Sequence, residues 1–352
     1  MMDYDVVVAT RNRPEALRLS IPLILGQGRP PHQLIIVDAS DDHEQTRQSV
    51  IRAVGDSPVK LEILYSRQPN IALQRNMGID CVKSPVVMFT DDDVFWWQGV
   101  GEAIMRVYER DRNGHIGGVC GVLATDPPPE AQLFVGSVYK MRLTDCIRQR
   151  IEFRYNKFVY RFCPDPFWIH GRSRWNVQPV PDWLPKENAV LVEYMGGARM
   201  SFRTEAIRSR GFDEDLGAYL GYSKSEDTEA SFYVMQKRLI VGVHDAKLYH
   251  HKFPGQRAES FDLGFISLFN PAYIVCRYSP NGSAAREAVK QFSIFKLMQY
   301  VLRMHTKFGR DRVRGAMLAI RLMKILLNTP PARLRERYLE LCENALQGHE
   351  SR

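Results

Sequence analysis

Residues 1–100 alternate between short apolar runs and segments with a helical pattern, and this alternation constrains the fold more than any other feature of the sequence. The apolar runs cover residues 5–9, 33–37, 59–65 and 86–89. Helical patterns separate them at residues 14–25, 43–54 and 71–82, and Pro14 suits the first turn of the first helix. Repeated strand and helix units place successive strands side by side and parallel. We therefore predict a doubly wound, mostly parallel α/β sheet with helices on both faces, whose ligands bind at the carboxyl ends of the strands.

Three successive carboxylates, Asp91, Asp92 and Asp93, follow the fourth apolar run. Adjacent like charges at the end of a buried strand are costly unless a cation neutralises them. If the chain stays extended, Asp91 and Asp93 project to one side and Asp92 to the other. Carboxylate oxygens suit Mg²⁺ or Mn²⁺, and such ions bridge the phosphates of nucleotides. The pattern predicts a metal site, with a solvated acidic turn as the alternative.

Polar residues also follow the first and second predicted strands. They are Asp38 and the run Thr10, Arg11, Asn12 and Arg13. Asp38 can accept a hydrogen bond from a ribose hydroxyl or a base N–H, and Arg75 and Asn76 on the third helix can reach base or phosphate. A helix cap is the alternative for Asp38, and a solvated arginine is the alternative for Arg75. The chain lacks G-x-G-x-x-G after the first strand and any G-x-x-x-x-G-K-[ST], so dinucleotide and P-loop sites lose their main support.

Four segments in register resemble the nucleotide-sugar half of family 2 glycosyltransferases. They are Val7–Arg13, Ile35–Ser40, Leu73–Gly78 and Phe89–Asp93. The resemblance implies the GT-A fold, a nucleotide-diphosphate sugar as donor, and a D-x-D motif that holds Mn²⁺ or Mg²⁺ on the donor diphosphate. It also implies that Asp91 lies near the ribose, that Asp92 belongs to the donor site and that Asp93 binds the metal.

Three segments of the second half extend this resemblance. They are Tyr194–Ile207, Gly211–Glu214 and Ser225–Glu229. The resemblance places Gly197 against the donor sugar, and places Glu226 and Asp227 at the start of a helix beside the acceptor. Asp227 would be the base that deprotonates the acceptor hydroxyl in an inverting displacement, whereas Glu226 lies in the donor site or serves the helix N-terminus.

The same resemblance implies a histidine ligand after the last strand. We expect two strands at residues 239–244 and 247–251, and the doublet His250-His251 ends the second of these strands. His250 is the expected metal ligand, with His251 as the alternative. The next loop carries Lys252 and Arg257, either of which would contact the diphosphate if the loop closes over the donor.

Residues 125–195 contain many aromatic and basic side chains. They include Tyr155, Tyr160, Phe167, Trp168, His170, Arg172, Arg174, Trp175 and Trp183. Aromatic faces and arginines bind sugars and phosphates, so these residues either form acceptor-binding walls or simply pack.

The C-terminal segment is helical and basic. Residues 284–352 hold 14 Lys+Arg against 6 Asp+Glu, whereas the rest of the chain holds 34 of each. Three apolar stripes are expected, at Phe292, Phe295, Met298 and Leu302; at Val313, Met317, Ile320, Met323 and Leu327; and at Leu334, Tyr338, Leu341 and Ala345. Such helices either lie on an anionic membrane near a lipid-linked acceptor or pack on the catalytic domain or a second subunit. A nucleic-acid partner is not expected, because no reader module is present.

These observations define one catalytic domain and one appendage. Residues 1–280 form the GT-A domain, with the nucleotide-binding half in 1–124 and the acceptor and catalytic half in 125–280; residues 281–352 form the helical C-terminal region. No membrane span, signal peptide or cysteine framework is recognised, so we expect a cytoplasmic protein, at most at the inner face of the membrane.

The expected function is metal-dependent transfer of a hexosyl or deoxyhexosyl group to a hydroxyl of a carbohydrate or lipid-linked acceptor, in surface polysaccharide or glycolipid synthesis. The alternatives are a sugar-phosphate nucleotidyltransferase and a non-catalytic nucleotide-sugar-binding scaffold. The first alternative normally needs a glycine-rich loop after strand one, and residues 10–13 contain no glycine. A homo-oligomer is compatible with the sequence.

Overall fold

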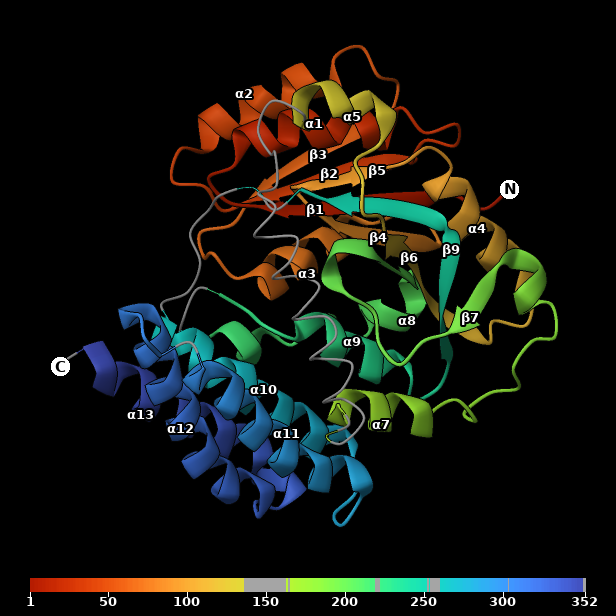
Figure 1. Cartoon of the computed structure of the whole chain (residues 1–352). Coiled ribbons are helices and arrows are strands. Elements are labelled where there is room, and N and C mark those ends of the chain that lie inside the picture. Colours follow the sequence, from red (N-terminus) through yellow and green to blue (C-terminus); the bar gives the residue numbers. More distant parts are fainter. Residues whose placement is uncertain are drawn as a thin grey trace. The chain divides into compact units, whose positions relative to one another are not determined.

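Figure 1 shows the computed structural model of the chain, which describes residues 1–135, 163, 165–218, 222–251, 253, 260–302 and 304–350. The chain forms two compact units. The first comprises the described residues within 1–139, 174–214 and 226–256, and the second comprises those within 140–173, 215–225 and 257–352. The expected boundary at residue 280 therefore differs from this division, which assigns the helix of residues 260–278 to the second unit.

The predicted alternation of strands and helices is present in the first unit. In chain order the elements are β1 (Tyr4–Thr10), α1 (Pro14–Leu25), β2 (Gln33–Asp38), α2 (His43–Val54), β3 (Lys60–Tyr65), α3 (Ile71–Cys81) and β4 (Val86–Asp91). The four strands pair in parallel in the order β3-β2-β1-β4. The carboxyl ends of β1, β2 and β4 therefore share one edge of the sheet.

The rest of the first unit extends this sheet with antiparallel and parallel strands. Its elements are β5 (Val94–Trp96), α4 (Val100–Arg110), β6 (Ile116–Leu123), α5 (Pro129–Val135), η1 (Leu184–Glu187), β7 (Ala189–Leu191), η2 (Gly197–Arg199), β8 (Met200–Arg203), α8 (Thr204–Arg208), α9 (Glu226–Val234) and β9 (Leu239–His250). The short η3 (Glu214–Gly217) continues into the second unit from residue 215. Among the described residues, nine strands form one sheet in the order β3-β2-β1-β4-β8-β6-β9-β5, with β7 paired to β9. The expectation of two strands at 239–244 and 247–251 was wrong. Residues 239–250 form one strand, whose register against β6 shifts between Cys120 and Val122.

The alternation of side chains along β1 divides the core between two faces. Val6 and Val8 are fully buried in a cluster that includes residues of α1, α2 and α4. Val7 points to the opposite face and contacts α3, where a Cβ at Gly78 would lie 2.4 Å from Val7 Cγ1. Figure 1 shows α1 and α2 on one face of the sheet and α3 on the other. The close approach of α3 to β1 brings Gln74 and Arg75 to the edge where the parallel strands end.

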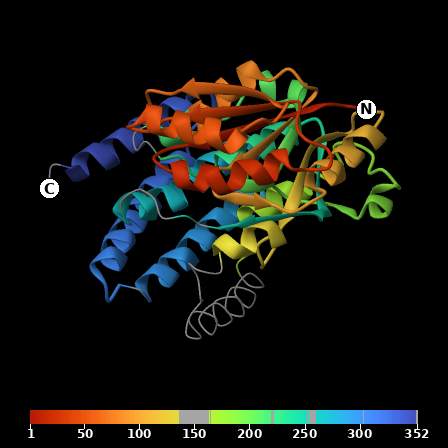
Figure 2. The same cartoon turned by 90° about the horizontal axis from the view of Figure 1, so that it is seen from above.

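The second unit is helical. Its helices are α7 (Pro166–Ser173), α10 (Ser260–Tyr278), α11 (Ala284–Val301), α12 (Lys307–Leu327), the short η4 (Pro331–Arg333) and α13 (Leu334–Glu350), and α10 to α13 are blue and cyan in Figures 1 and 2. Two glycines let α10 and α12 approach closely, because a Cβ at Gly264 would lie 2.2 Å from Arg312 O and one at Gly315 would lie 2.0 Å from Phe261 O. This contact explains why α10 belongs with the C-terminal helices.

Two of the three apolar stripes predicted for these helices were partly wrong. On α11, Phe292 and Phe295 are buried, but Met298 is 58% exposed and Leu302 is 70% exposed. On α12 the buried residues are Gly309, Gly315, Ala316, Ala319, Met323 and Leu326, whereas Met317 is exposed. The stripe of α13 agrees with the prediction, since Leu334, Tyr338, Leu341 and Ala345 are buried. Among the described residues, no helix combines the length and the low polarity needed to cross a bilayer.

Candidate functional site

Three of the predicted polar strand ends meet at one edge of the sheet. Thr10 is the register partner of Asp38, and Ala9 is the register partner of Asp91. These pairings place the end of β1 between those of β2 and β4. The gathering follows from parallel pairing, which aligns the carboxyl ends of neighbouring strands.

Asp92 has different partners from Asp91 and Asp93 at this edge. Asp91 ends β4, and Asp92 and Asp93 form a turn that leads into β5. Asp92 accepts hydrogen bonds from Thr10 Oγ1 at 2.8 Å and from Arg13 Nη1 at 3.1 Å. Burial raises the pKa of Asp92 to about 7, although Arg13 opposes that shift. Asp92 therefore anchors the β1–α1 loop, and Arg13 Nη1 also lies 3.4 Å from Asp93 Oδ2.

Asp93 lies in a more strongly cationic environment. Its Oδ2 is 3.4 Å from Arg13 Nη1 and accepts a hydrogen bond from the backbone N–H of Phe253 at 2.9 Å. Burial alone would raise the pKa of Asp93, but His250, Arg13 and the Phe253 N–H outweigh burial and hold that pKa below its ordinary value. The side chain is thus an ionised carboxylate at neutral pH.

Asp91, Asp93 and His250 form a candidate metal centre. One ligand atom from each lies within 4.8 Å of the others. Asp93 Oδ1 is buried, and it lies 3.0 Å from His250 Nε2. Adjacent ligands of an octahedral ion with bonds near 2.1 Å are also separated by about 3.0 Å. An oxygen and imidazole donor set of this kind suits Mn²⁺, and its carboxylates also suit Mg²⁺.

The two histidines at the end of β9, His250 and His251, have different partners. His250 faces the carboxylates, whereas the ring of His251 stacks on Phe95 with centroids 5.2 Å apart and an interplanar angle of 18°. The backbone N–H of His251 donates to the backbone carbonyl of Asp93. Burial lowers the pKa of His251, as expected for an imidazole packed among aromatic rings. His250 is therefore the histidine placed to bind a cation.

Arg75 links the metal centre to the start of α9. Its Nη1 donates to Glu226 Oε1 at 2.8 Å and its Nη2 donates to Asp91 Oδ1 at 3.1 Å. The Arg75 side chain is only 3% exposed, and its guanidinium lies over the ring of Phe212 at 5.4 Å. Arg75 is thus a buried partner of these two carboxylates and not a solvated helix residue.

Glu226 shares the buried guanidinium but is strongly desolvated. Burial, with a further contribution from neighbouring Asp227, raises the pKa of Glu226 to about 7, against the lowering effect of Arg75. Its carboxyl is 2.8 Å from Arg75 Nη1. A group in this state can accept or release a proton near neutrality, so its charge responds to whatever binds beside it.

Gly197 and Asp227 are joined directly. The backbone N–H of Gly197 donates to Asp227 Oδ2 at 2.7 Å, and the N–H of Thr228 donates to Oδ1 at 2.7 Å. A Cβ at Gly197 would lie 2.7 Å from Arg75 Nη2, so only glycine fits without displacing the guanidinium. Asp227 is half-buried, and its charge contributes to raising the pKa of Asp91. The structure therefore brings the predicted glycine, the predicted base and the metal carboxylates into one site.

The site carries an excess of carboxyl groups. The site contains three more carboxyl groups than guanidinium groups. The five carboxyl groups belong to Asp91, Asp92, Asp93, Glu226 and Asp227, and the two guanidinium groups belong to Arg13 and Arg75. Burial also raises the pKa of Asp91, despite Arg75. Such an excess favours a bound divalent cation, because the cation would offset repulsion that the two arginines leave.

Asp38 is held by residues that the sequence analysis did not select. Its Oδ1 accepts from the backbone N–H and the hydroxyl of Ser40, and its Oδ2 accepts from His43 Nδ1 at 2.7 Å. The Asp38 side chain is fully buried, while that of His43 is 34% exposed and its ring lies 4.8 Å from that of Tyr65. A ligand reaching this strand end meets His43 before Asp38. The sequence signal was the D-x-S-x-x-H spacing at a strand end, which permits a carboxylate to fix an imidazole.

Arg11, Asn12 and Asn76 have mainly structural partners. Asn12 adopts φ 54° and ties the β1–α1 loop to Asp41, and Arg11 Nη2 lies 3.9 Å from the same carboxylate. The Asn76 amide donates to Phe212 O and Glu214 Oε1 and accepts from the Phe212 N–H. Gln74, another residue not selected, donates from Nε2 to the carbonyls of Thr10 and Val37. These contacts fix the loops around the crevice.

The aromatic segment has packing partners where it is described. Trp175 donates to Val192 O, Arg174 donates to Met235 O and Gln236 O, and Arg110 lies over the ring of Trp183. In the second unit, His170 hydrogen-bonds to Ser279 Oγ. Tyr155, Tyr160, Lys252 and Arg257 lie outside the described residues.

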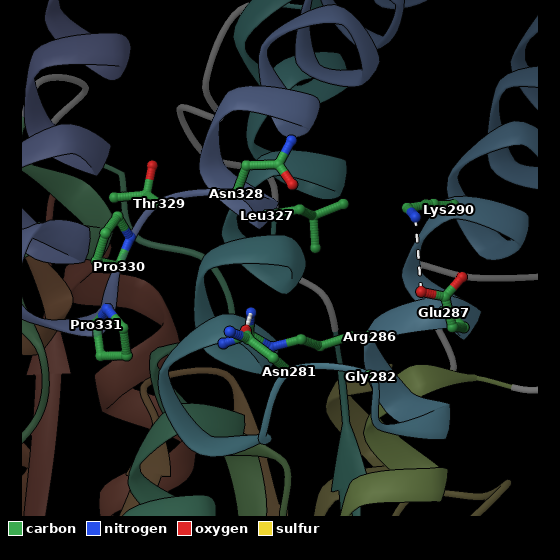
Figure 3. A pocket seen from close by; sticks show the side chains of 10 residues that line it. All are labelled: Asn281, Gly282, Arg286, Glu287, Lys290, Leu327, Asn328, Thr329, Pro330 and Pro331. Atoms are coloured by element: carbon green, nitrogen blue, oxygen red, sulfur yellow. Dashed lines mark hydrogen bonds and ion pairs between the residues drawn. The ribbon is translucent and has the colours of Figure 1, made fainter.

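A cavity of about 490 Å³ lies in the second unit, and Figure 3 shows the residues that line it. They come from the α10–α11 turn, the first turns of α11, the end of α12 and the segment that follows. The Arg286 guanidinium donates to the carbonyls of Ser279 and Cys276 and to Asn281 Oδ1, and Lys290 pairs with Glu287. The cavity therefore holds no convergent set of catalytic groups.

The fold and the acidic strand edge define an α/β domain with a candidate site for a divalent cation. Residues 5–158 match the family model described as Glycosyl transferase family 2. The matched segment includes Asp91, Asp92 and Asp93, whereas Gly197, Asp227 and His250 follow it along the chain.

The solved structures that resemble this chain include two that each cover 99% of it. One is the mannosyltransferase PcManGT from Pyrobaculum calidifontis in complex with GDP-Man and Mn²⁺, with 14% identity, a TM-score of 0.54, and coverage of 99% of this chain and 90% of that one. The other is residues 1–349 of S. aureus TarS in complex with UDP-GlcNAc, with 13% identity, a TM-score of 0.54, and coverage of 99% and 92%. Comparison with curated proteins gave no match. The chain accordingly has the GT-A type fold that was predicted, together with C-terminal helices.

Proposed function

We propose that the protein is a metal-dependent, inverting glycosyltransferase that moves a sugar from a nucleotide-diphosphate sugar to a hydroxyl of a carbohydrate or lipid-linked acceptor. The observation that carries the proposal is the gathering of Asp91, Asp93 and His250 with Asp227 around the ends of β4 and β9 and the start of α9. The family match supports glycosyl transfer, and the donors bound by PcManGT and TarS support a nucleotide sugar.

In this proposal the polar strand ends bind the donor. The exposed imidazole of His43, fixed by Asp38, and the loop of Thr10, Arg11, Asn12 and Arg13 would contact the nucleoside. Arg75 would keep Asp91 and Glu226 in place beside the ribose and the sugar. Arg13 lies between Asp92 and Asp93 with 22% of its side chain exposed, so it can also offer charge to the diphosphate.

Asp93 and His250, with Asp91 beside them, would hold Mn²⁺ or Mg²⁺. When bound, the ion would neutralise the charge that develops on the diphosphate leaving group. Mn²⁺ in the PcManGT complex supports this choice, and the buried Asp93 Oδ1 supplies the oxygen that such an ion requires.

Asp227 would act as the base. Its Oδ1 accepts from the N–H and the hydroxyl of Thr228, and its Oδ2 accepts from the N–H of Gly197. These contacts fix the orientation of the carboxylate and leave Oδ2 a further acceptor position. The acceptor oxygen bonds to the anomeric carbon as the bond from that carbon to the phosphate oxygen breaks. The acceptor proton passes to Asp227, and the electron pair of the broken bond leaves with the nucleoside diphosphate.

The test is Asp227→Asn, with Asp80→Asn on the exposed face of α3 as the matched control. Loss of the base should lower turnover by about 10²- to 10⁴-fold. Calorimetry should show donor affinity within about threefold of the unmodified protein, because the carboxylates that would hold the ion are unchanged. The substrate panel of UDP-, GDP- and dTDP-sugars is screened by nucleoside-diphosphate release. Turnover within tenfold of the unmodified protein would reject Asp227 as the base.

A further inference from the structure

An unusual concentration of exposed apolar side chains occurs where α11 ends and α12 begins. The exposed residues are Met298 (58% exposed), Val301 (43%), Leu302 (70%), Met304 (47%) and Phe308 (54%). We call these five residues the apolar tip. Single exposed apolar residues are ordinary, but five within eleven positions of one helix–turn–helix segment are a patch that needs a partner.

The helices that carry the tip have buried faces of their own. Ala288, Val289, Phe292 and Phe295 bury the inner face of α11, and Ala316, Ala319, Met323 and Leu326 bury the inner face of α12. Arg312 lies over the rings of Tyr300 and Phe308 at 5.5 and 4.9 Å, which holds the ends of the two helices together. Apart from Phe308, the residues of the apolar tip are therefore not needed for the packing that forms the helical unit.

A row of cations adjoins the apolar tip on α12. Lys307, Arg310, Arg314, Arg321 and Lys324 are all exposed, and we call them the basic stripe. Their spacing of three, four, seven and three residues keeps them on one face, opposite the buried alanines. The stripe extends over about 26 Å of helix. Among the described residues, only Arg314 of the five has a carboxylate within 4.0 Å, at Asp311.

We propose that the apolar tip and the basic stripe form a docking surface for an anionic phospholipid bilayer. The tip would enter the region between headgroups and acyl chains, and the stripe would lie along the anionic headgroups. The geometry favours a bilayer because the apolar residues occupy a turn between helices and the cations continue from that turn along one helix.

A second copy of the chain is a poorer partner for the same surface. Residues 284–352 carry 14 Lys+Arg against 6 Asp+Glu, so two such surfaces would repel each other. A lipid surface supplies negative charge and an apolar layer together. This inference does not depend on the proposed transfer reaction, because none of the ten residues belongs to the candidate site.

Vesicle co-sedimentation of the full chain tests the proposal. Vesicles of equal parts phosphatidylglycerol and phosphatidylcholine should bind the protein at low salt, and vesicles of phosphatidylcholine alone should bind it far less. The triple variant Val301→Ser, Leu302→Ser, Met304→Ser removes three of the five apolar side chains of the tip without touching the buried faces. The variant Arg314→Gln, Arg321→Gln, Lys324→Gln removes three cations, each of which should contribute about fivefold to affinity.

The control changes two exposed residues of α2. Ile51→Ser matches the replacement of apolar residues by serine, and Arg52→Gln matches the replacement of cations by glutamine. Both surface variants should bind at least tenfold more weakly than this control, while donor hydrolysis without vesicles stays unchanged in all three. In Leu302→Trp, anionic vesicles should shift tryptophan emission to shorter wavelength by comparison with buffer. Equal binding of the tip variant and the control would overturn the proposal. So would light scattering that shows a dimer which the tip variant converts to monomer.

Discussion

Replacing Arg75 by methionine tests the role of the guanidinium that joins Asp91 of the candidate metal centre to Glu226 at the start of α9. Methionine preserves much of the length and apolar contact of the arginine side chain on Phe212. It removes the two hydrogen-bonded ion pairs at 2.8 Å to Glu226 and 3.1 Å to Asp91. The variant therefore leaves two carboxyl groups facing each other without their shared cation.

The magnitude follows from the burial of these groups. The side chains of Arg75 and Glu226 are 3% and 9% exposed, whereas that of Asp91 is 28% exposed. Removing one partner of a buried ion pair costs about 3–5 kcal/mol, and the partial exposure of Asp91 places the expected loss near the lower limit. We expect about 3 kcal/mol at about pH 8.

The loss should depend on pH with a defined sign. The pKa of Glu226 is raised from its ordinary 4.5 to about 7, so desolvation of the ionised group costs stability above about pH 7 and costs none below 4.5. Without Arg75 this pKa rises further, and a neutral Glu226 at low pH has less need of the missing cation. The destabilisation caused by Arg75→Met should therefore shrink to about 1 kcal/mol near pH 5.

Urea unfolding in the presence of a chelator, at several pH values, measures this effect. The control is Arg52→Met on the exposed surface of α2, which should change the free energy of unfolding by less than about 0.5 kcal/mol. A destabilisation by Arg75→Met that is below about 1 kcal/mol at pH 8, or that is the same at both pH values, would refute the assigned ion pairs.

Two further comparisons use neighbouring residues as matched pairs. His250→Gln should weaken Mn²⁺ binding by about tenfold or more because it removes a ligand, whereas His251→Gln should leave Mn²⁺ affinity unchanged and lower the melting temperature by loss of the Phe95 stack. Equal Mn²⁺ affinities in the two variants would contradict the assignment of the doublet. Gly197→Ala should lower turnover by about a hundredfold, because its Cβ would lie 2.7 Å from Arg75 Nη2. Gly196→Ala should have little effect, since its Cβ would meet only Arg199 Nε at 3.7 Å; comparable activity of both alanine variants would argue against the packing of Gly197 on Arg75.

The first four strands and their helices were predictable because local patterns and tertiary structure agree there. Pro14 begins α1 as expected, and the helix of residues 43–54 has the predicted bounds. Each strand is short and mostly apolar, and each is separated from the next by a helix, which leaves parallel pairing as the simplest arrangement. The edge that collects Thr10, Asp38 and Asp91 follows from that pairing.

The aspartates that lie on the same side were predicted from the sequence, but the structural reason given for that arrangement was wrong. Asp91 and Asp93 do share a side with His250, and Asp92 does point away. The chain turns at Asp92 and Asp93, so the strict alternation of an extended strand is not the reason. Partners supplied by distant segments, Thr10 and Arg13 on one side and His250 on the other, orient these side chains. A sequence pattern does not contain those long-range contacts.

The C-terminal helices show where periodicity is insufficient. The α11 stripe through Met298 and Leu302 has the spacing of a buried face, yet these residues are exposed. Several apolar residues of α11 lie off that stripe, including Val289 and Ile294, so the pattern is compatible with more than one buried face. Packing against α10 and α12, which depends on Gly264 and Gly315 as well as on apolar side chains, selects the face that is buried.

The central claim is that Asp91, Asp93 and His250 hold a divalent cation beside the base Asp227. Titration of Mn²⁺ into the protein with a nucleoside diphosphate, followed by calorimetry and by the electron paramagnetic resonance of the ion, tests it most directly. The account predicts tight binding of one Mn²⁺ in the unmodified protein, its loss in Asp93→Asn and its retention in Asp227→Asn. Undiminished Mn²⁺ binding by Asp93→Asn would contradict the account.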